Sequence, residues 1–406
     1  MPFPNQTMNL ARLLRAFSAA LDLGSPGTTA HHQRVTLIAL ELGRALGLED
    51  DAREHLFYAS IIHDIGVSTT RERMAILGPD SASPHHAVVG ANRLEASRLL
   101  APYAHTVRYH HQRWDGAVPG ELGGDEIPLL ARIVHLADRT AVLITNDAPV
   151  LRQTETLIRT IRRRSGGEFD PALVECLSEV LLKEELLLDS TSGFMCERID
   201  EEAPRRNIEV SVDDLVGVSQ VFAEVIDGKT PYTRRHSQNV ARVAGRLSAM
   251  LGFSRREVRL MEVAGLLHDL GKLSVDDGIL DKRAPLDPDE QLTMKQHPYY
   301  TYRILRMVDG LEMVSEWAAL HHERMNGKGY PFHVDGDSLS LGSRIMAVAD
   351  VVSALSEDRP YRQALSDDDI TTLMQRLATQ GELDPTVVSP LLRSLSHVRS
   401  VANKEV

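Results

Sequence analysis

Apolar residues recur at three- and four-residue spacing along most of the chain, and this periodicity predicts amphipathic helices. Residues 35–46 show it clearly and end at Gly47, and residues 240–251 followed by Gly252 repeat the arrangement. Alternating apolar and polar positions, which would predict strands, are sparse, and only 5% of the residues are aromatic. The pattern therefore predicts an all-α fold.

The helical pattern occurs twice, with the same polar residues at matching places. The matching pairs are His31–His63 and His236–His268, each 32 positions apart, and His86–His110 and His297–His321, each 24 apart. Both copies also contain an apolar run that ends in His-Asp, then a His-His pair and an Ala-Asp pair. A repeat of this kind indicates a duplicated domain, so we expect two tandem helical domains.

The polar segments suggest where each domain ends. We expect a first domain over residues 1–188 with a helix over 10–23, and a second domain over residues 207–406. Residues 189–206 mix Ser, Thr, Gly, charged residues and Pro204, which predicts an interdomain linker. Further helices over 150–188 and 366–396 would close the two domains.

Composition narrows the class of protein. The chain has 406 residues, 43% of them hydrophobic and 25% charged, as in ordinary globular proteins, and a net charge of −12. That charge argues against binding to a DNA or RNA duplex. We find no run of about 18 apolar residues and no secretory signal, so we expect a cytoplasmic protein that does not enter a membrane. Two cysteines make a disulfide framework unlikely.

The repeated histidines and aspartates point to metal ions. In the second copy the candidate ligands are His236, His268, Asp269, His297, His321, His322 and Asp350. Imidazole and carboxylate groups suit divalent transition metals, and the absence of cysteine argues against a structural zinc site. These ligands are too many for one ion that keeps a position open for water. We expect two ions, which together can activate water, polarise a phosphoryl oxygen and stabilise a leaving oxygen.

Several motifs of the second half together resemble the HD-GYP family. They are His-Asp-Leu-Gly-Lys at 268–272, His297-Pro298, the run from His321 to Pro331, Ala349-Asp350, and Asp358-Arg359-Pro360-Tyr361-Arg362. The resemblance covers about residues 210–400. It implies an all-helical, metal-dependent phosphodiesterase of bacterial second-messenger signalling, which hydrolyses cyclic di-GMP to linear pGpG, to GMP, or to both.

The resemblance also implies roles for single residues. It assigns the seven candidates as ligands of two ions, Fe or Mn, with Asp269 shared between them. Asp269 and Lys272 would be catalytic, and Lys272 and Arg324 would bind phosphate. The remaining substrate contacts would come from Gly329, Tyr330 and Pro331. Tyr232 stands where some relatives hold a third metal through Glu, which favours two ions unless Glu224 or Asp227 substitutes.

The first copy has a full ligand set but lacks other motifs. Its candidates for a second metal site are His31, His63, Asp64, His86, His110, His111 and Asp138. Val67 stands in place of Lys272, and no Gly-Tyr-Pro follows the His-His pair. We therefore expect a divergent HD domain that binds metal and has a regulatory or dimer-forming role. Gly123-Gly124-Asp125-Glu126 resembles a diguanylate cyclase signature, but the repeat explains it as a turn.

Two other functions stay open. One is a hydrolase selective for 3′,3′-cyclic GMP-AMP, because no residue that reads the bases is identifiable. The other is a regulator that binds a cyclic dinucleotide without cutting it, although such a protein would be expected to lack ligands and the second copy lacks none. The metal, the end product, the regulatory input and a homodimeric state are also open.

Overall fold

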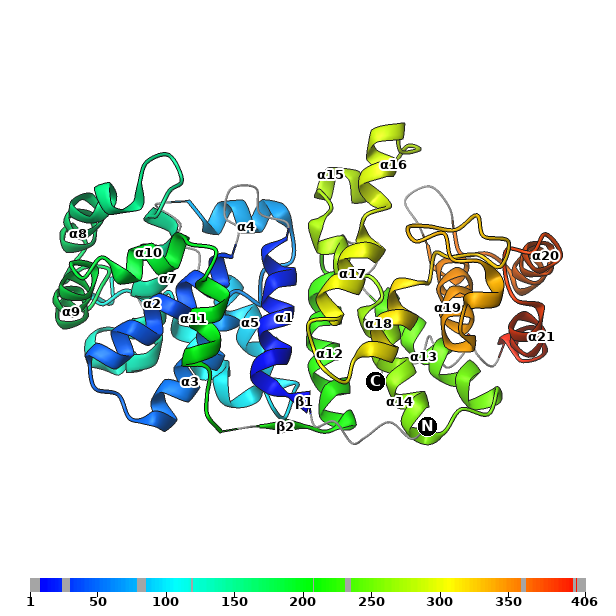
Figure 1. Cartoon of the computed structure of the whole chain (residues 1–406), viewed down its shortest axis with the longest axis horizontal. Helices are drawn as coiled ribbons and strands as arrows, with labels where there is room; N and C mark the ends of the chain where they lie inside the picture. The colour runs from blue at the N-terminus through cyan, green and yellow to red at the C-terminus, as the bar shows by residue number, and fades with distance from the viewer. Residues whose placement is uncertain are drawn as a thin grey trace. The chain divides into compact units, whose positions relative to one another are not determined.

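The computed structural model describes residues 8–23, 30–78, 85–117, 120–206, 208–230, 235–358, 363–396 and 399 (Figure 1). The chain divides into two compact units: Asn9–Ile208, called the first unit here, and Glu209–Val406 with Met8, called the second unit. Apart from the short strands β1 (Met8–Asn9) and β2 (Glu209–Val210), which pair with each other, the named elements of the described residues are helices. The all-α prediction is confirmed.

The first unit has eleven named α-helices within its described residues. They are α1 (Leu10–Asp22), α2 (His31–Ala45), α3 (Asp50–Ile61), α4 (Thr70–Ile76), α5 (His85–Glu95), α6 (Ala104–Tyr109), α7 (Leu129–Leu143), α8 (Thr154–Arg163), α9 (Pro171–Leu181), α10 (Glu185–Thr191) and α11 (Met195–Glu202). Short 3₁₀ turns lie between them: η1 (Ala101–Tyr103), η2 (Gly124–Glu126) and η3 (Val150–Gln153).

The second unit has ten named α-helices within its described residues. They are α12 (Val212–Asp227), α13 (His236–Met250), α14 (Arg255–Leu267), α15 (Asp277–Leu280), α16 (Pro288–Met294), α17 (His297–Leu305), α18 (Glu312–Ala319), α19 (Leu341–Ser356), α20 (Asp367–Thr379) and α21 (Pro385–Arg393). The 3₁₀ turns are η4 (Leu270–Ser274) and η5 (Gly336–Ser338).

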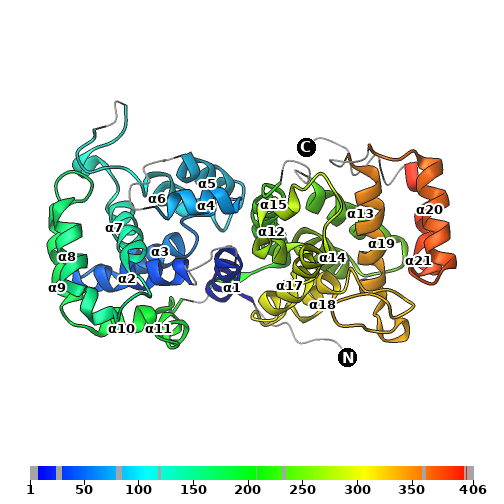
Figure 2. The ribbon, with the colours of Figure 1, turned by 90° about the horizontal axis from the view of Figure 1, so that it is seen from above.

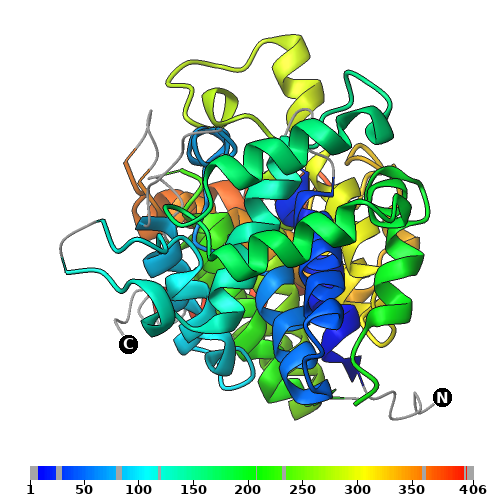
Figure 3. The same ribbon diagram turned by 90° about the vertical axis from the view of Figure 1, so that its left-hand side faces the viewer.

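The order of helices repeats between the units, in agreement with the predicted duplication. Helix α2 packs against α3 and α7, and α13 packs in the same way against α14 and α19. In each unit a pair of later helices contact each other. Figure 2 shows α20 beside α21, and Figure 3 shows α8 beside α9 in green. The turn at 123–126, which we assigned to the repeat, forms η2, and η5 stands at the matching place.

A buried carboxylate fixes the start of the central helix in each unit. Asp22 accepts hydrogen bonds from the backbone nitrogen of His32 at 3.3 Å and from its Nδ1 at 2.6 Å. Asp227 accepts from the backbone nitrogen of Ser237 at 3.2 Å and from its Oγ at 2.6 Å. These bonds satisfy amide groups of the first helical turn that have no partner within the helix. The first candidate ligand of each unit lies in that turn.

The far end of each central helix is also built alike. Gly47 and Gly252 have φ of +69° and +86°, the left-handed conformation that commonly ends a helix. The next helix of the second unit, α14, begins with a capping box between Ser254 and Glu257. These local signals place the apolar helix that leads to His-Asp at a fixed position against the central helix.

The segment predicted as a linker has regular structure. Residues 189–206 contain the end of α10 and all of α11, and both helices pack against α2. Ile199 of α11 is fully buried and holds that helix on the core. The division between the units falls between Ile208 and Glu209. The polar residues of 189–206 lie on helices that also have a buried apolar side, so this segment belongs to the first unit.

Two further expectations can be compared with the described residues. Cys176 and Cys196 are both free thiols. No helix among the described residues has the length and apolar character that crossing a membrane requires.

Candidate metal centre

The second unit brings its seven candidate ligands together from five segments. His236 opens α13, His268 and Asp269 follow α14, His297 opens α17, His321 and His322 follow α18, and Asp350 lies within α19. Six of them are at most 9% exposed, and His322 is half-buried. Overlapping groups of these residues place their ligand atoms within 4.8 Å of one another.

Backbone carbonyl groups orient three of the imidazole rings. The Nδ1 atoms of His268, His297 and His321 donate to the carbonyl oxygens of Gly265, Met294 and Ala318, at 2.8, 2.7 and 2.6 Å. Since Nδ1 then carries the proton, Nε2 keeps its lone pair and points it into the cluster. This is the tautomer that a metal-ligating histidine requires.

Asp269 lies between two sets of histidines. Its Oδ2 is 3.3 Å from Nε2 of His268 and 3.9 Å from Nε2 of His236. Its Oδ1 is 3.4 Å from Nε2 of His297 and 3.9 Å from Nε2 of His321. Each carboxylate oxygen therefore faces a different set of ligands, which is the arrangement of a carboxylate shared by two ions.

The two remaining ligands complete one set each. Oδ1 of Asp350 is 3.3 Å from Nε2 of His236 and 3.9 Å from Nε2 of His268. His322 offers a nitrogen within 4.8 Å of those of His297 and His321. Each set thus contains four donor groups when Asp269 is counted in both.

Burial and the neighbouring carboxylates set the charge on the histidines. Burial lowers the pKa of His297 to about 4 and that of His321 to about 3, so both rings are neutral at pH 7. Burial also lowers the pKa of His236, but hydrogen bonds to Asp350 and Glu357 outweigh burial and raise this pKa to about 10. Without a metal, His236 is therefore the charged member of these three.

The shared carboxylate is ionised. Burial alone would raise the pKa of Asp269, but electrostatic interactions with His268 and with the ammonium group of Lys272 hold it well below its ordinary value. Nζ of Lys272 lies 2.6 Å from Oδ2 of Asp269. The negative charge needed to attract cations is thus present at neutral pH.

The donor set fits two divalent transition-metal ions. Nε2 of His268 and Oδ1 of Asp269 are buried without a hydrogen-bond partner, and such an atom costs about 1–3 kcal/mol if it stays unsatisfied. All donors are imidazole nitrogens or carboxylate oxygens, a mixture that suits metals such as Fe and Mn. The first ion would lie among His236, His268, Asp269 and Asp350, and the second among Asp269, His297, His321 and His322.

The two predicted phosphate-binding cations have different surroundings. Lys272 stands on η4 beside Asp269 and keeps 22% of its side chain exposed, so it reaches both the cluster and solvent. Arg324 donates through Nη1 to the carbonyl oxygens of His321 and Glu323, at 3.1 and 3.0 Å. Part of the Arg324 guanidinium therefore stabilises the turn after the His-His pair.

The Gly-Tyr-Pro loop, Gly329 to Pro331, packs directly onto the ligands. A Cβ on Gly329 would lie 2.3 Å from Cα of Glu323, so only glycine fits there. The ring of Tyr330 stacks on that of His322, with centroids 4.7 Å apart. A cis peptide bond joins Tyr330 to Pro331. The loop therefore forms a wall beside the second set of ligands.

Sequence reasoning missed a carboxylate that organises this wall. Glu323, with 1% exposure, accepts hydrogen bonds from three successive backbone nitrogens, those of Phe332, His333 and Val334, at 2.8, 3.1 and 3.2 Å. It fixes the chain directly after Gly-Tyr-Pro. Its position straight after the His-His pair was the available signal, but the sequence does not show what the carboxylate binds.

Two more positioning residues were also missed. Oγ1 of Thr301 donates to the carbonyl oxygen of His268 at 3.0 Å and accepts from the nitrogen of Gly271 at 2.9 Å, so it ties the His-Asp turn to α17. Glu357 accepts from Nδ1 of His236 at 3.0 Å and orients that ring. Two expectations, on Tyr232 and on residues 359–362 of the Asp-Arg-Pro-Tyr-Arg motif, lie outside the described residues.

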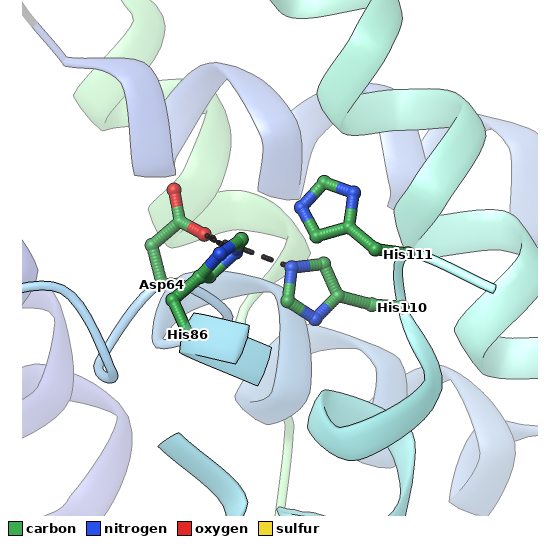
Figure 4. A group of neighbouring side chains, drawn as sticks. All are labelled: Asp64, His86, His110 and His111. Carbon is green, nitrogen blue, oxygen red and sulfur yellow. Dashed lines mark ion pairs between the residues drawn. The ribbon is translucent and has the colours of Figure 1, made fainter. Parts of the chain in front are cut away.

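The first unit repeats the geometry around its own shared carboxylate. Oδ2 of Asp64 is 3.3 Å from Nε2 of His63 and 3.8 Å from that of His31. Its Oδ1 is 3.2 Å from Nε2 of His86 and 3.6 Å from that of His110, the two ion pairs drawn in Figure 4. Asp64 therefore also presents one oxygen to each of two histidine sets.

The two other candidates of the first unit join the same cluster. Oδ1 of Asp138 is 3.2 Å from Nε2 of His31. His111 lies beside His110 in Figure 4, with ring centroids 4.2 Å apart. All seven residues predicted as a second metal site are thus brought together.

Comparison with known proteins agrees with this geometry. Two family models, each described as an HD domain, match residues 28–143 and 220–387. The chain is 30% identical over 409 residues to "3'3'-cGAMP-specific phosphodiesterase 1" of Vibrio cholerae, and the match covers 95% of this chain and 92% of that protein. The chain belongs to the HD-domain phosphodiesterase family. It is therefore an enzyme of the phosphoric diester hydrolase class.

Two further members of this family show how far the likeness extends. A crystal structure of a cyclic GMP-AMP specific phosphodiesterase of V. cholerae matches with a TM-score of 0.67 and 25% identity, over 96% of this chain and 98% of that one. "Cyclic di-GMP phosphodiesterase response regulator RpfG" of Xanthomonas campestris is 36% identical over 186 residues, which cover 45% of this chain and 49% of that protein. The likeness to the two V. cholerae proteins thus includes both units.

Proposed function

We propose that the second unit hydrolyses a cyclic dinucleotide and that 3′,3′-cyclic GMP-AMP is its preferred substrate. The observation that carries the reaction type is the carboxylate of Asp269, whose two oxygens face two different sets of candidate metal ligands. The substrate preference rests on the relatives named for cyclic GMP-AMP, which match along both units. Our expectation of cyclic di-GMP ranks second, because its support comes from a match over less than half of the chain.

The ligand geometry supports metal-assisted hydrolysis. Divalent ions in the two sets would activate water and carry charge that develops on a phosphoryl oxygen. The chain's own residues prepare this chemistry: neutral Nε2 atoms face inward, and Asp269 is ionised. Fe and Mn remain the proposed metals, because nitrogen and carboxylate donors suit both.

Lys272 is the residue best placed to act on the substrate's phosphate. Its ammonium group lies beside the shared carboxylate and is partly exposed, so a phosphodiester bound at the cluster would come within its reach. There it would offset the negative charge that grows on a non-bridging oxygen as the bond to phosphorus forms. Tyr330, stacked on His322, and the neighbouring Gly329 and Pro331 would bound the substrate on the other side.

The proposed reaction opens the ring of the dinucleotide. Water adds to the phosphorus of one diester, the 3′-oxygen leaves, and the product is a linear dinucleotide. A second cut would release mononucleotides. With cyclic di-GMP as substrate, the corresponding products are pGpG and GMP.

The test is hydrolysis of the two substrates side by side. The full chain, loaded with Fe or Mn, is incubated with equal concentrations of 3′,3′-cyclic GMP-AMP and cyclic di-GMP, and products are separated by chromatography. We expect a higher kcat/KM for 3′,3′-cyclic GMP-AMP and loss of both reactions in Asp269→Ala. A higher kcat/KM for cyclic di-GMP would overturn the preference. Nucleotide binding with full metal occupancy but no product would overturn the activity and favour a binding regulator.

A further inference from the structure

The cluster of candidate metal ligands in the first unit contains many buried polar atoms that lack a hydrogen bond. Eight polar atoms of its side chains have no hydrogen bond: Nε2 of His31, His63, His110 and His111, both ring nitrogens of His86, Oδ1 of Asp64 and Oδ1 of Asp138. Folding would not leave so many polar atoms unsatisfied in one place, because each carries a desolvation cost. They face one another, and imidazole and carboxylate donors at these spacings are ligands for divalent metal ions.

A buried guanidinium group is one difference between this cluster and the cluster of the second unit. Arg139, which follows Asp138 on α7, donates through Nε and Nη2 to Oδ2 of that aspartate, at 3.0 and 2.8 Å. Its Nη2 also donates to the carbonyl oxygen of Ile76 at 2.9 Å, and Nη1 to that of Gly78 at 3.2 Å. Arg139 therefore ties a ligand of the cluster to the C-terminal end of α4.

Helix α4 is fixed at its other end as well. Thr69 and Glu72 form a capping box, and the Glu72 carboxylate also accepts from the nitrogen of Ser68 at 3.1 Å. Oγ of Ser68 accepts in turn from Nη2 of Arg93 on α5 at 2.8 Å. Both ends of this short helix are thus anchored to elements that carry ligands.

The cavity between α4 and two of the ligands, His31 and Asp64, is very small. A cavity of about 10 Å³ is lined by His31, Asp64, Val67 and, from α4, Arg73 and Ile76. Such a volume holds about one water molecule, whereas pockets for small organic ligands have volumes of about 300–1,000 Å³. This cavity therefore has room for a water molecule, but not for a dinucleotide.

The second unit differs at the same positions. Val351 takes the place of Arg139, and the matching ligand, Asp350, keeps 13% of its side chain exposed, against 1% for Asp138. Lys272 is partly exposed, whereas Val67, which takes its place, is buried. The first cluster has the same five histidines and two carboxylates, but the guanidinium of Arg139 is bonded to Asp138 and to carbonyl groups at the end of α4.

We propose that the first unit holds a closed two-metal centre, sealed by Arg139 and α4, which binds divalent transition-metal ions and excludes the dinucleotide. Its ligands come from α2, the turn after α3, α5, the end of α6 and α7. Ions bound there link these segments into one body. The centre is thus a structural metal site, built on the same arrangement of helices as the catalytic centre of the second unit.

Metal content tests the first half of the proposal. The full chain and the matched variants Asp64→Ala and Asp269→Ala are loaded with Mn²⁺, freed of excess metal and measured by mass spectrometry, with circular dichroism to confirm folding. We expect about four ions in the wild type and about two in each variant, since each centre holds two. His86→Ala replaces Asp64→Ala if the latter does not fold. An unchanged metal content in both first-unit variants would overturn the proposal.

Metal release tests the closure. Asp269→Ala keeps only the first centre and Asp64→Ala only the second, so zinc-loaded samples of each are mixed with a chromogenic chelator. Release from the first centre should be slower by about tenfold or more, because α4 must open first. Adding Arg139→Ala, or Arg139→Lys, to the Asp269→Ala chain should accelerate release. Equal rates for the two centres, or no effect of either Arg139 variant, would refute the seal.

Ligand counting tests the exclusion of substrate. Calorimetric titration of the metal-loaded wild type with a phosphorothioate analogue of 3′,3′-cyclic GMP-AMP should give one site per chain, unchanged in Asp64→Ala. Two sites in the wild type, with one lost in Asp64→Ala, would contradict the proposal. The metal measurements need no substrate, so they stand apart from any failure of the proposed hydrolysis.

Discussion

Gly271 offers a sharp test of how the second unit positions its ligands. The residue follows the His-Asp pair, and a Cβ placed on it would lie 1.9 Å from the carbonyl oxygen of His297. Such contacts do not occur below 3.0 Å, so in Gly271→Ala the two segments must separate by about 1.1 Å, which is 3.0 minus 1.9. His297 opens α17 and lies 3.4 Å from the shared carboxylate, so this shift falls on a metal ligand.

The size of the effect follows from that displacement. A misplacement of about 1 Å in an active site can lower the rate about a hundredfold, and overpacking typically costs about 1–3 kcal/mol of stability. We therefore expect Gly271→Ala to fold, to melt at a lower temperature, and to lose about a hundredfold in kcat/KM. The assay is steady-state hydrolysis of 3′,3′-cyclic GMP-AMP, together with metal content and thermal unfolding.

The duplicated chain supplies a matched control. A Cβ on Gly66 would lie 1.9 Å from the carbonyl oxygen of His86 and 2.6 Å from the nitrogen of Gly90, a clash at least as severe. Gly66→Ala should lose stability and metal from the first unit while it keeps its activity. Full activity in Gly271→Ala, or equal loss of activity in both variants, would refute this reasoning.

Three other expectations concern single residues of the second unit. Lys272→Met should lower kcat about a hundredfold or more with metal content unchanged, because the charge near the reacting phosphate is lost; a kcat within threefold of wild type would contradict its role. Glu323→Ala leaves three backbone amides without their acceptor, so we expect a loss of about 1–3 kcal/mol in urea unfolding and a raised KM; an unchanged KM would show that the wall does not touch substrate. His236, whose pKa is raised to about 10, must give up its proton to bind metal, so metal affinity should increase with pH up to about pH 10. Calorimetry in buffers of different ionisation enthalpy measures the released proton, and a proton count of zero at pH 7 for the second unit would contradict this assignment.

The sequence predicted the parts of the fold that depend on local signals. Helical periodicity that ends at a glycine predicted α2 and α13, and the equal spacings of the histidines predicted the duplication. The linker prediction relied on polar composition and did not indicate the helices that lie in residues 189–206. Residues of α11 such as Ile199 are held by packing against a helix far away in the sequence, which composition does not report.

At the site, too, the sequence predicted what depends on residue type and spacing, but not what depends on long-range contacts. The sequence indicated all fourteen candidate ligands, which the structure brings together in two clusters, because ligand chemistry restricts the residue types and the repeat supplied each position twice. The residues that hold the ligands in place could not be found in this way. Thr301 and Glu323 act through backbone atoms of other segments, and Arg139 through the carbonyl groups of α4, so their roles depend on contacts that only the folded chain creates.

The central claim is that two clusters with the same ligands have different tasks, and that only the second cluster catalyses hydrolysis. The most direct test is kcat/KM for 3′,3′-cyclic GMP-AMP measured for the wild type, Asp64→Ala and Asp269→Ala under identical metal loading. The account predicts that Asp64→Ala retains most of the wild-type value and that Asp269→Ala loses at least about a thousandfold, since a shared metal ligand is removed. Activity that survives in Asp269→Ala but disappears in Asp64→Ala would contradict it.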